Sequence, residues 1–310
     1  MAEPIPIEAR SLLCLGYGYS AAALARRLGA REEGWRIIGT TRRPEKAARM
    51  GADGVEALLC GDNAHAPSDA AVEAALERCA FLLVSAGPDA AGDPLLRRHG
   101  RAVERAAPSM RWAGYLSTTG VYGDHHGAWI DETAALTPAT ERGRHRVEAE
   151  SAWRAVEERH GLPLHIFRLA GIYGPGRGPF AKLRGGTARR IVKDGQVFSR
   201  IHVDDIAQIL EASMRQPRPG AAYNVCDDEP APPQDVIAHA AALLEMTPPP
   251  ETPFEEAAAT MTPMAASFYS ESKRVSNALM KRELGVTLAY PTYREGLSAV
   301  LEAEAAAPPR

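Results

Sequence analysis

The residues best suited to chemistry begin at a glycine-rich turn near the start of the chain. The apolar run 12–15 leads into Gly16-Tyr17-Gly18-Tyr19-Ser20-Ala21, and a helix-like segment follows. The first glycine permits a tight turn, the second lets backbone approach a pyrophosphate, and Ala21 lets helix and strand pack closely. Free N–H groups and the helix dipole would face the anion. A glycine turn without a ligand would share these letters, but the strand before it and the helix after it favour dinucleotide binding.

A pair of arginines follows the second apolar run. An NAD-preferring site would place an acid here, on the ribose 2′-hydroxyl. The chain instead carries Arg42 and Arg43, whose planar, permanently charged donors suit a 2′-phosphate. We therefore expect NADP(H) to be preferred over NAD(H). The alternative is a solvated basic cluster at a helix start, because Lys46 and Arg49 follow closely.

Two further turns complete the expected cofactor pocket. Asp62 and Asn63 follow the third run, where the carboxylate could accept from an adenine amino group, although a turn-forming pair would look the same. The fourth run ends in Ser85-Ala86-Gly87, a second small-residue turn. Both turns are assigned to the cofactor.

Short apolar runs alternate with Ala-, Leu- and Arg-rich helical segments in the first half of the chain, as in a βαβ series. The predicted strands are 11–15, 36–40, 54–60, 81–85, 112–117 and 164–168. This pattern predicts an α/β fold with a Rossmann-like, doubly wound parallel sheet. After Gly171, Gly/Pro-rich stretches indicate that the βαβ alternation gives way to more irregular structure. We expect a dinucleotide-binding core over 1–170 and, over 171–310, a small C-terminal substrate lobe interleaved with the last sheet elements, in one compact unit.

Composition narrows the partners. The net charge is -3 and the isoelectric point is near 6.3, so no basic excess exists for nucleic acid or an anionic membrane surface. The opening residues lack the apolar stretch of a leader or span, and a cytoplasmic location is expected. Four scattered cysteines form no CxxC pair, so no metal site is expected there. We also reject a metal at His202 with Asp204 and Asp205, and expect one of these aspartates to cap a helix.

Four ordered motifs carry a resemblance to a known family. They are the glycine turn, the segment 115–124 (YLSTTGVYGD), the segment 168–176 (RLAGIYGPG) and the segment 200–205 (RIHVDD). Together they resemble the NAD-dependent epimerase/dehydratase family of extended short-chain dehydrogenases/reductases, in its atypical branch. The resemblance covers residues 12 to about 301. It implies a Rossmann-like sheet with a small substrate lobe.

The resemblance assigns roles and also reveals a departure. It implies that Thr118 polarises a substrate hydroxyl or carbonyl. The family then uses a Tyr-x-x-x-Lys pair on the next helix, but this chain has Arg142 and Arg146 at those positions, and Gly171 where the family often has Asn. Arginine does not lose its proton in proteins, so the usual relay is absent. Arg146 could still donate to the ribose hydroxyls, with different geometry.

Other groups near the expected reaction site are candidates for catalysis or for substrate binding. Tyr122 is a candidate catalytic residue, although packing beneath the cofactor is the stronger interpretation. His125 is a candidate substrate contact, and His125 or His126 could carry the relay, against a reading of both as surface residues. Arg177 and Arg184 could pair with an anionic substrate, or form a solvated basic face.

These observations predict an NADP(H)-binding oxidoreductase or epimerase-like enzyme. Its small-molecule substrate would carry a hydroxyl or carbonyl, or resemble a nucleotide sugar. The alternative is a non-catalytic dinucleotide-binding sensor or scaffold, which Arg142 and Arg146 favour. The resemblance also implies a homodimer formed through helices near 95–107 and 140–160.

Overall fold

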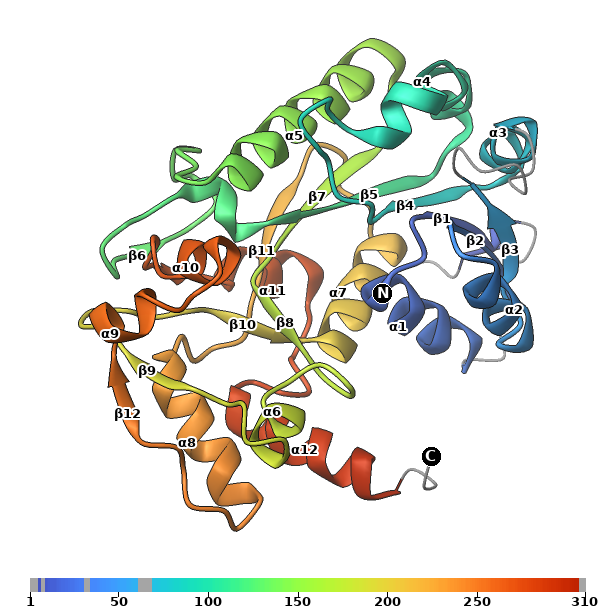
Figure 1. Ribbon diagram of the computed structural model, residues 1–310. Helices are drawn as coiled ribbons and strands as arrows, with labels where there is room; N and C mark the ends of the chain where they lie inside the picture. The colour runs from blue at the N-terminus through green and yellow to red at the C-terminus, as the bar shows by residue number, and fades with distance from the viewer. Residues whose placement is uncertain (1–4, 7–8, 31–33, 61–68, 307–310) are drawn as a thin grey trace.

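The computed structural model describes residues 5–6, 9–30, 34–60 and 69–306, and its centre is a seven-stranded parallel sheet (Figure 1). In spatial order the strands run β3, β2, β1, β4, β5, β7 and β11. Their bounds are β1 Ser11–Leu15, β2 Arg36–Thr41, β3 Glu56–Leu59, β4 Phe81–Val84, β5 Trp112–Thr118, β7 Leu164–Leu169 and β11 Ala222–Val225. This order reverses direction between β1 and β4, and a crevice is expected at such a switch point.

The central strands β1 and β4 are mostly apolar and almost wholly buried. All four residues of β4 are buried, as are four of the five in β1. A strand covered on both faces needs apolar side chains at odd and even positions alike, which explains why these runs do not alternate with polar residues. One hydrophobic cluster includes Leu12 and Cys14, and the other includes Leu13 and Leu15. The two faces of β1 therefore belong to two separate cores.

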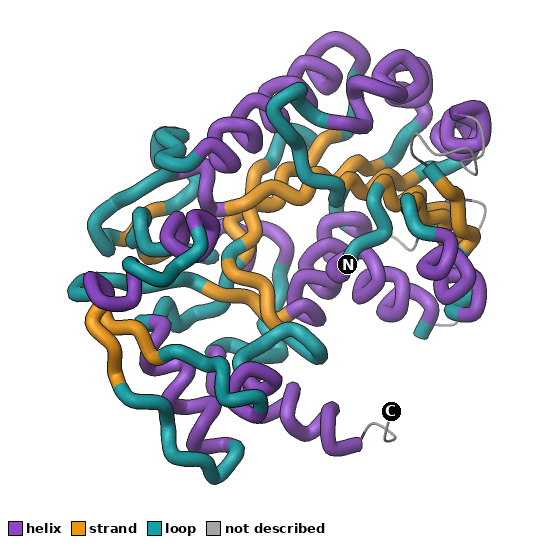
Figure 2. The backbone as a smooth tube through the Cα atoms, in the orientation of Figure 1, coloured by secondary structure: helices purple, strands orange, loops and turns teal. Residues whose placement is uncertain are grey.

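Helices cover both faces of the sheet (Figures 1 and 2). Four helices contribute to one core: α1 Tyr19–Gly29, α2 Pro44–Ala52, α7 Val203–Arg215 and α11 Ala278–Leu284. Three contribute to the other: α3 Asp69–Arg78, α4 Pro94–Ala106 and α5 Glu141–His160. The expectation of a Rossmann-like, doubly wound α/β fold is confirmed.

A smaller lobe lies below the sheet in Figure 1. It is built from paired short strands: β8 Gly171–Tyr173 with β10 Arg200–His202, and β9 Arg190–Val192 with β12 Glu251–Pro253. A third pair joins β6 Trp129–Ile130 to β13 Arg274–Val275. Its helices are α6 Phe180–Arg184, α8 Pro233–Leu243, α9 Phe254–Ala258, α10 Pro263–Phe268 and α12 Tyr293–Ala306. A separate apolar cluster that includes Phe180, Ala240 and Leu297 holds part of this lobe together.

The second half of the chain also returns to the main sheet. Strand β11 pairs with β7, and α7 packs on α1, so the residues after 170 supply both lobes. The six predicted strands are present, the first with its predicted bounds and the others with shifted ends, whereas β11 was not predicted. The expected aspartate cap of α7 is wrong. The His202 side chain caps the helix by accepting the Asp204 N–H at 3.2 Å, and Asp205 accepts from Ala289 and Tyr290.

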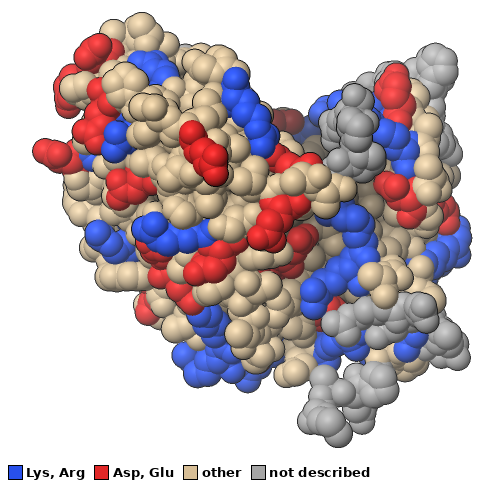
Figure 3. Space-filling view, turned by 90° about the horizontal axis from the view of Figure 1, so that it is seen from below, with Lys and Arg blue, Asp and Glu red and all other residues tan. Residues whose placement is uncertain are grey.

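The surface has mixed charge. Figure 3 shows Lys and Arg side by side with Asp and Glu over the face seen from below. Within the described ranges, no helix is long and apolar enough to cross a membrane. Among the same residues, no group of His, Cys, Asp and Glu is arranged to hold a metal ion.

Candidate active site

A cleft of about 1060 Å³ lies at the carboxyl ends of the central strands, where the small lobe faces the sheet. Each of four strands leads into its wall. Gly18 follows β1, Ser85 follows β4, Thr118 ends β5, and Gly171 follows β7. The cleft therefore occupies the position that the topology of the sheet reserves for a ligand.

The two small-residue turns are locked together at the base of this cleft. Gly16 has a φ of +86°, and a Cβ there would lie 2.9 Å from the Ala86 backbone nitrogen. The Ser85 hydroxyl donates to the Gly16 carbonyl, and the Gly16 N–H donates to the Thr40 hydroxyl at 2.7 Å. A side chain at position 16 would both strain the backbone and separate the turns. The structure therefore explains why the first position of this turn is a glycine.

The start of α1 is open to the cleft. Gly18 is the N-cap residue and provides no side-chain cap, and the nearest non-local atom to its would-be Cβ is the Ser85 hydroxyl, 3.7 Å away. Tyr19 and Ser20 line the cleft beside it, whereas Ala21 is fully buried against the sheet. Uncapped N–H groups at a helix N-terminus with space in front of them fit a pyrophosphate.

Two other predicted cofactor residues, Tyr17 and Gly87, pack close to the cleft without lining it. Tyr17 is buried, and its ring covers Gly39 so closely that a Cβ there would lie 2.7 Å from a ring carbon. A Cβ on Gly87 would lie 3.4 Å from Nη2 of Arg146. Neither Tyr17 nor Gly87 lines the cleft.

Arg42 and Arg43 stand at the carboxyl end of β2, next to β1 in the sheet. Both are exposed, and Arg43 is the N-cap residue of α2. Among the described residues, neither guanidinium has a carboxylate within ion-pair distance. The nearby Lys46 ammonium donates to the Tyr17 carbonyl, and burial followed by the Arg43 charge lowers the pKa of Lys46. The predicted Asp62 and Asn63 contacts lie outside the described residues.

Thr118 and the start of α5 form the opposite wall. The Thr118 hydroxyl accepts the Gly120 N–H at 3.2 Å and can still donate its own proton. Helix α5 approaches this turn closely because Gly143 has no side chain, since a Cβ there would lie 2.8 Å from the Gly120 carbonyl oxygen. Arg142 and Arg146 line the cleft on either side of Gly143. The structure therefore brings Thr118 and both arginines to one site.

Tyr122 does not belong to that wall, and its assignment as a catalytic residue is corrected. The ring is fully buried and absent from the cleft lining. Its hydroxyl donates to the Asn224 side chain at 2.7 Å and accepts from Arg168 at 2.8 Å. Burial raises the pKa of Tyr122 despite the Arg168 charge. Arg168 also pairs with the buried Glu150 at 2.9 Å, so Tyr122 is part of a packed ionic network.

The histidine loop also points elsewhere. Nε2 of His125 lies 3.2 Å from the Tyr122 carbonyl oxygen, and the His125 N–H donates to Ser272. The His126 side chain is 93% exposed and lies 3.0 Å from Asp124. Neither histidine lines the cleft, so the substrate contact at His125 and the relay at either residue are not supported by position.

The two candidate arginines of the small lobe separate. Arg177 lines the cleft, with its guanidinium over the Tyr19 ring. Arg184 does not line it and instead pairs with Glu304 at 2.6 Å, so its assignment to substrate is also corrected. Residues far along the chain supply groups that the sequence did not single out. Lys273 lines the cleft and donates to both Glu271 and the Gly123 carbonyl at 2.6 Å.

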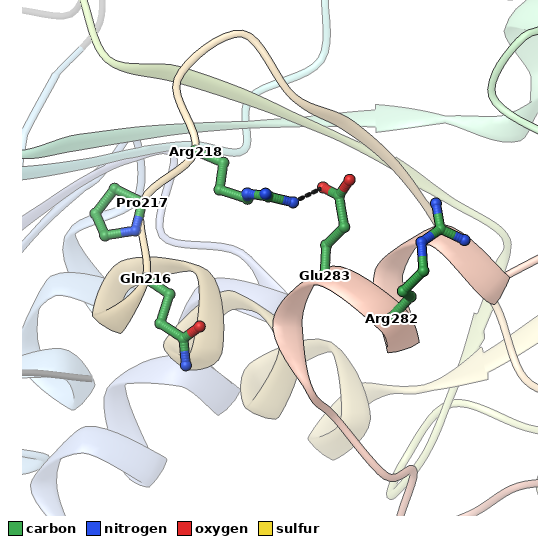
Figure 4. Close-up of a pocket in the computed structure, with 5 residues that line it drawn as sticks. All are labelled: Gln216, Pro217, Arg218, Arg282 and Glu283. Atoms are coloured by element: carbon green, nitrogen blue, oxygen red, sulfur yellow. Dashed lines mark ion pairs between the residues drawn. The ribbon is translucent and has the colours of Figure 1, made fainter. Parts of the chain in front are cut away.

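A second hollow of about 540 Å³ lies away from these residues (Figure 4). Arg218 and Glu283 face each other across it in a 2.8 Å ion pair, with Gln216, Pro217 and Arg282 around them. It is open and mostly polar, and none of the predicted site residues lines it. The cleft at the carboxyl ends of the central strands is the candidate active site.

The strand order, the glycine turn at the β1/β4 switch point and the lobe over the carboxyl ends define an extended short-chain dehydrogenase/reductase with an NAD(P)-binding core. The chain belongs to the NAD dependent epimerase/dehydratase family, whose model matches residues 15–226. The resemblance found in the motifs is therefore confirmed.

Individual relatives are similar to different degrees. A functionally unknown conserved protein from Silicibacter pomeroyi is 56% identical, with a TM-score of 0.86 over 94% of this chain and 98% of that one. Protein YeeZ of Escherichia coli K12 is 29% identical over 70% of this chain and 77% of its own. A UDP-glucuronic acid 4-epimerase from Bacillus cereus, solved with UDP-glucuronic acid and NAD, has a TM-score of 0.72 at 15% identity, covering 95% and 99%. The last likeness shows the shared fold.

Proposed function

We propose that this protein is an NADP(H)-dependent oxidoreductase or epimerase-like enzyme that acts on a small hydroxyl- or carbonyl-bearing substrate, including one that resembles a nucleotide sugar. Two neighbouring cationic features at the carboxyl ends of β1 and β2 support the proposal. The uncapped start of α1 opens onto the cleft. At the end of the neighbouring strand β2, Arg42 and Arg43 have no carboxylate partner among the described residues. A pyrophosphate and a 2′-phosphate would satisfy these two groups.

Each residue then has a stated task. The N–H groups that follow Gly18 bind the pyrophosphate, and the two arginines bind the 2′-phosphate. Arg146 donates a hydrogen bond to a ribose hydroxyl through one of its unused donor groups, while the Thr118 hydroxyl donates a hydrogen bond to the substrate oxygen. The bound dinucleotide supplies hydride-transfer chemistry. In this proposal no side chain at positions 142 and 146 moves a proton, because both are arginines.

That last feature favours a second candidate, a dinucleotide-binding sensor or scaffold that does no chemistry. Loss of the acid/base pair with retention of the cofactor turns is what such a protein would need. Turnover of any substrate with NADPH would exclude this second candidate, whereas tight binding without turnover over a broad panel of hydroxyl and carbonyl compounds would support it.

Calorimetric titration with NADPH, NADP, NADH and NAD tests the binding step. We expect micromolar affinity for NADPH, which corresponds to about 8 kcal/mol. Replacing Arg42 by Asp together with Arg43→Ala should weaken NADPH at least about tenfold while leaving NADH nearly unchanged, since only NADPH carries the extra phosphate. Arg49→Ala, on the exposed side of the same helix, is the matched control. Failure of all four dinucleotides to bind would refute the proposal.

A further inference from the structure

Arg142 and Arg146 form a pair on one face of α5. They are four residues apart, so their side chains leave the helix one above the other. Both line the cleft next to Thr118, and the close packing of Gly143 on Gly120 holds this end of the helix against the turn after β5. The cleft wall thus presents two guanidinium groups where the expected pair would be a tyrosine and a lysine.

Arg146 is held in place while keeping donors to spare. Its Nη1 donates to the Leu116 carbonyl at 2.7 Å and to the Tyr115 hydroxyl at 3.1 Å. Its guanidinium also lies over the Tyr115 ring, 5.7 Å from the centroid. Nε and Nη2 have no protein acceptor among the described residues, and Nη2 reaches toward Gly87. A fixed fork with two unused donor groups is prepared for an acceptor that the protein does not provide.

No carboxylate neutralises this pair in the described part of the chain. Glu141 lies 3.9 Å from His145, and Glu150 is committed to Arg168 in the buried network. Arg142 is exposed and has no ion-pair partner among the described side chains. It also occupies the first turn of α5, where the helix dipole adds positive potential. This end of the cleft is therefore cationic.

We propose that Arg142, together with the donor of Arg146 that the ribose leaves unused, forms a carboxylate-binding subsite, so that the substrate carries a carboxylate close to the hydroxyl or carbonyl that faces Thr118. Arginine binds a carboxylate through two parallel N–H···O bonds, a geometry that a lysine or tyrosine cannot reproduce. A hydroxy or oxo acid then takes the place of a neutral alcohol or ketone. The placement of the reacting carbon rests on the proposed function, but the anion subsite itself is present without cofactor.

The test uses oxalate as the probe and oxamide, its neutral analogue, as the comparison. Calorimetric titration at low salt is carried out on the full-length protein, with and without NADPH. We expect oxalate to bind, oxamide not to bind, and Arg142→Ala to weaken oxalate at least about tenfold, the loss of one bidentate charge-assisted pair. Arg142→Lys should recover only part of the affinity, because it restores the charge without the fork.

Arg144→Ala is the matched control. Arg144 is an exposed arginine on the same helix that does not line the cleft, so its removal lowers the net charge equally without touching the subsite. Absence of oxalate binding, or equal binding by Arg142→Ala and the unmodified protein, would overturn the subsite. Because NADPH is titrated into the same samples, a protein that binds oxalate but no dinucleotide would instead refute the proposed function alone.

Discussion

Lowering the pH should destabilise this protein through one buried histidine, His165 on β7. The side chain is fully buried and stacked on Trp112. Nδ1 lies 3.0 Å from the Pro163 carbonyl oxygen, and Nε2 accepts the Arg218 backbone N–H at 2.7 Å. A second ring proton would point at that N–H donor. Burial lowers the pKa of His165 to about 4, so the folded state keeps the ring neutral.

The direction and size of this change in stability follow from the protons that the folded and unfolded states bind. An unfolded histidine has a pKa near 6.5, so between about pH 6.5 and 4 the unfolded chain holds the extra proton and stability falls as the pH falls. The full difference is worth about 3 kcal/mol, of which about 2 kcal/mol is lost by pH 5. Above about pH 6.5 this contribution is complete and constant.

Urea denaturation at pH 7.5 and pH 5 measures the effect. His165→Gln can still accept from Arg218 but does not titrate, so its free energy of unfolding should change less between the two pH values, by about 2 kcal/mol. The exposed His126, replaced by Gln, is the control and should behave like the unmodified protein. Equal acid sensitivity in His165→Gln and the unmodified protein would refute the reasoning.

Two further substitutions probe the site. Gly16→Ala should cost about 1–3 kcal/mol of stability and abolish dinucleotide binding, because the left-handed backbone and the contact with Ala86 both oppose a side chain. Thermal unfolding measures the loss of stability, and calorimetry measures the loss of binding. Retained NADPH binding would contradict the role assigned to this turn. Glu150→Gln should lower the free energy of unfolding by about 3–5 kcal/mol, because it leaves the Arg168 charge buried and unpaired. Glu148→Gln, on the exposed side of the same helix, is the control and should be nearly neutral. Similar unfolding midpoints for the two variants would argue against a structural ion pair.

The sequence was most informative where local chemistry decides local structure. The apolar runs predicted six strands because a strand covered on both faces needs apolar residues at successive positions. Gly16 was identified because only a residue without a side chain suits its backbone and its contact with Ala86. Strand β11 was not predicted, because its four residues include Asn224, a polar residue whose buried hydrogen bonds form only after folding.

The substrate side was less predictable for a related reason. Tyr122 stands in a motif that suggests chemistry, yet the 3-10 helix Thr119–Tyr122 after β5 directs its ring into the core, toward Arg168 on β7. Lys273 and Glu271 have no spacing signal at all. They reach the cleft because β13 pairs with β6, a contact between segments more than a hundred residues apart. Such placements depend on tertiary packing and not on neighbours in the chain.

The chain passes between the sheet and the small lobe repeatedly: from β7 to β8, from β10 to α7, from β11 to α8, and from β13 to α11. A lobe attached by a single linker could swing open freely, but here any opening has to bend all of these connections together. The width of the cleft is therefore a property of the whole fold. Cutting the chain after residue 170 would remove β11 from the edge of the sheet and expose the face of α1 that α7 covers, so we expect neither piece to persist alone.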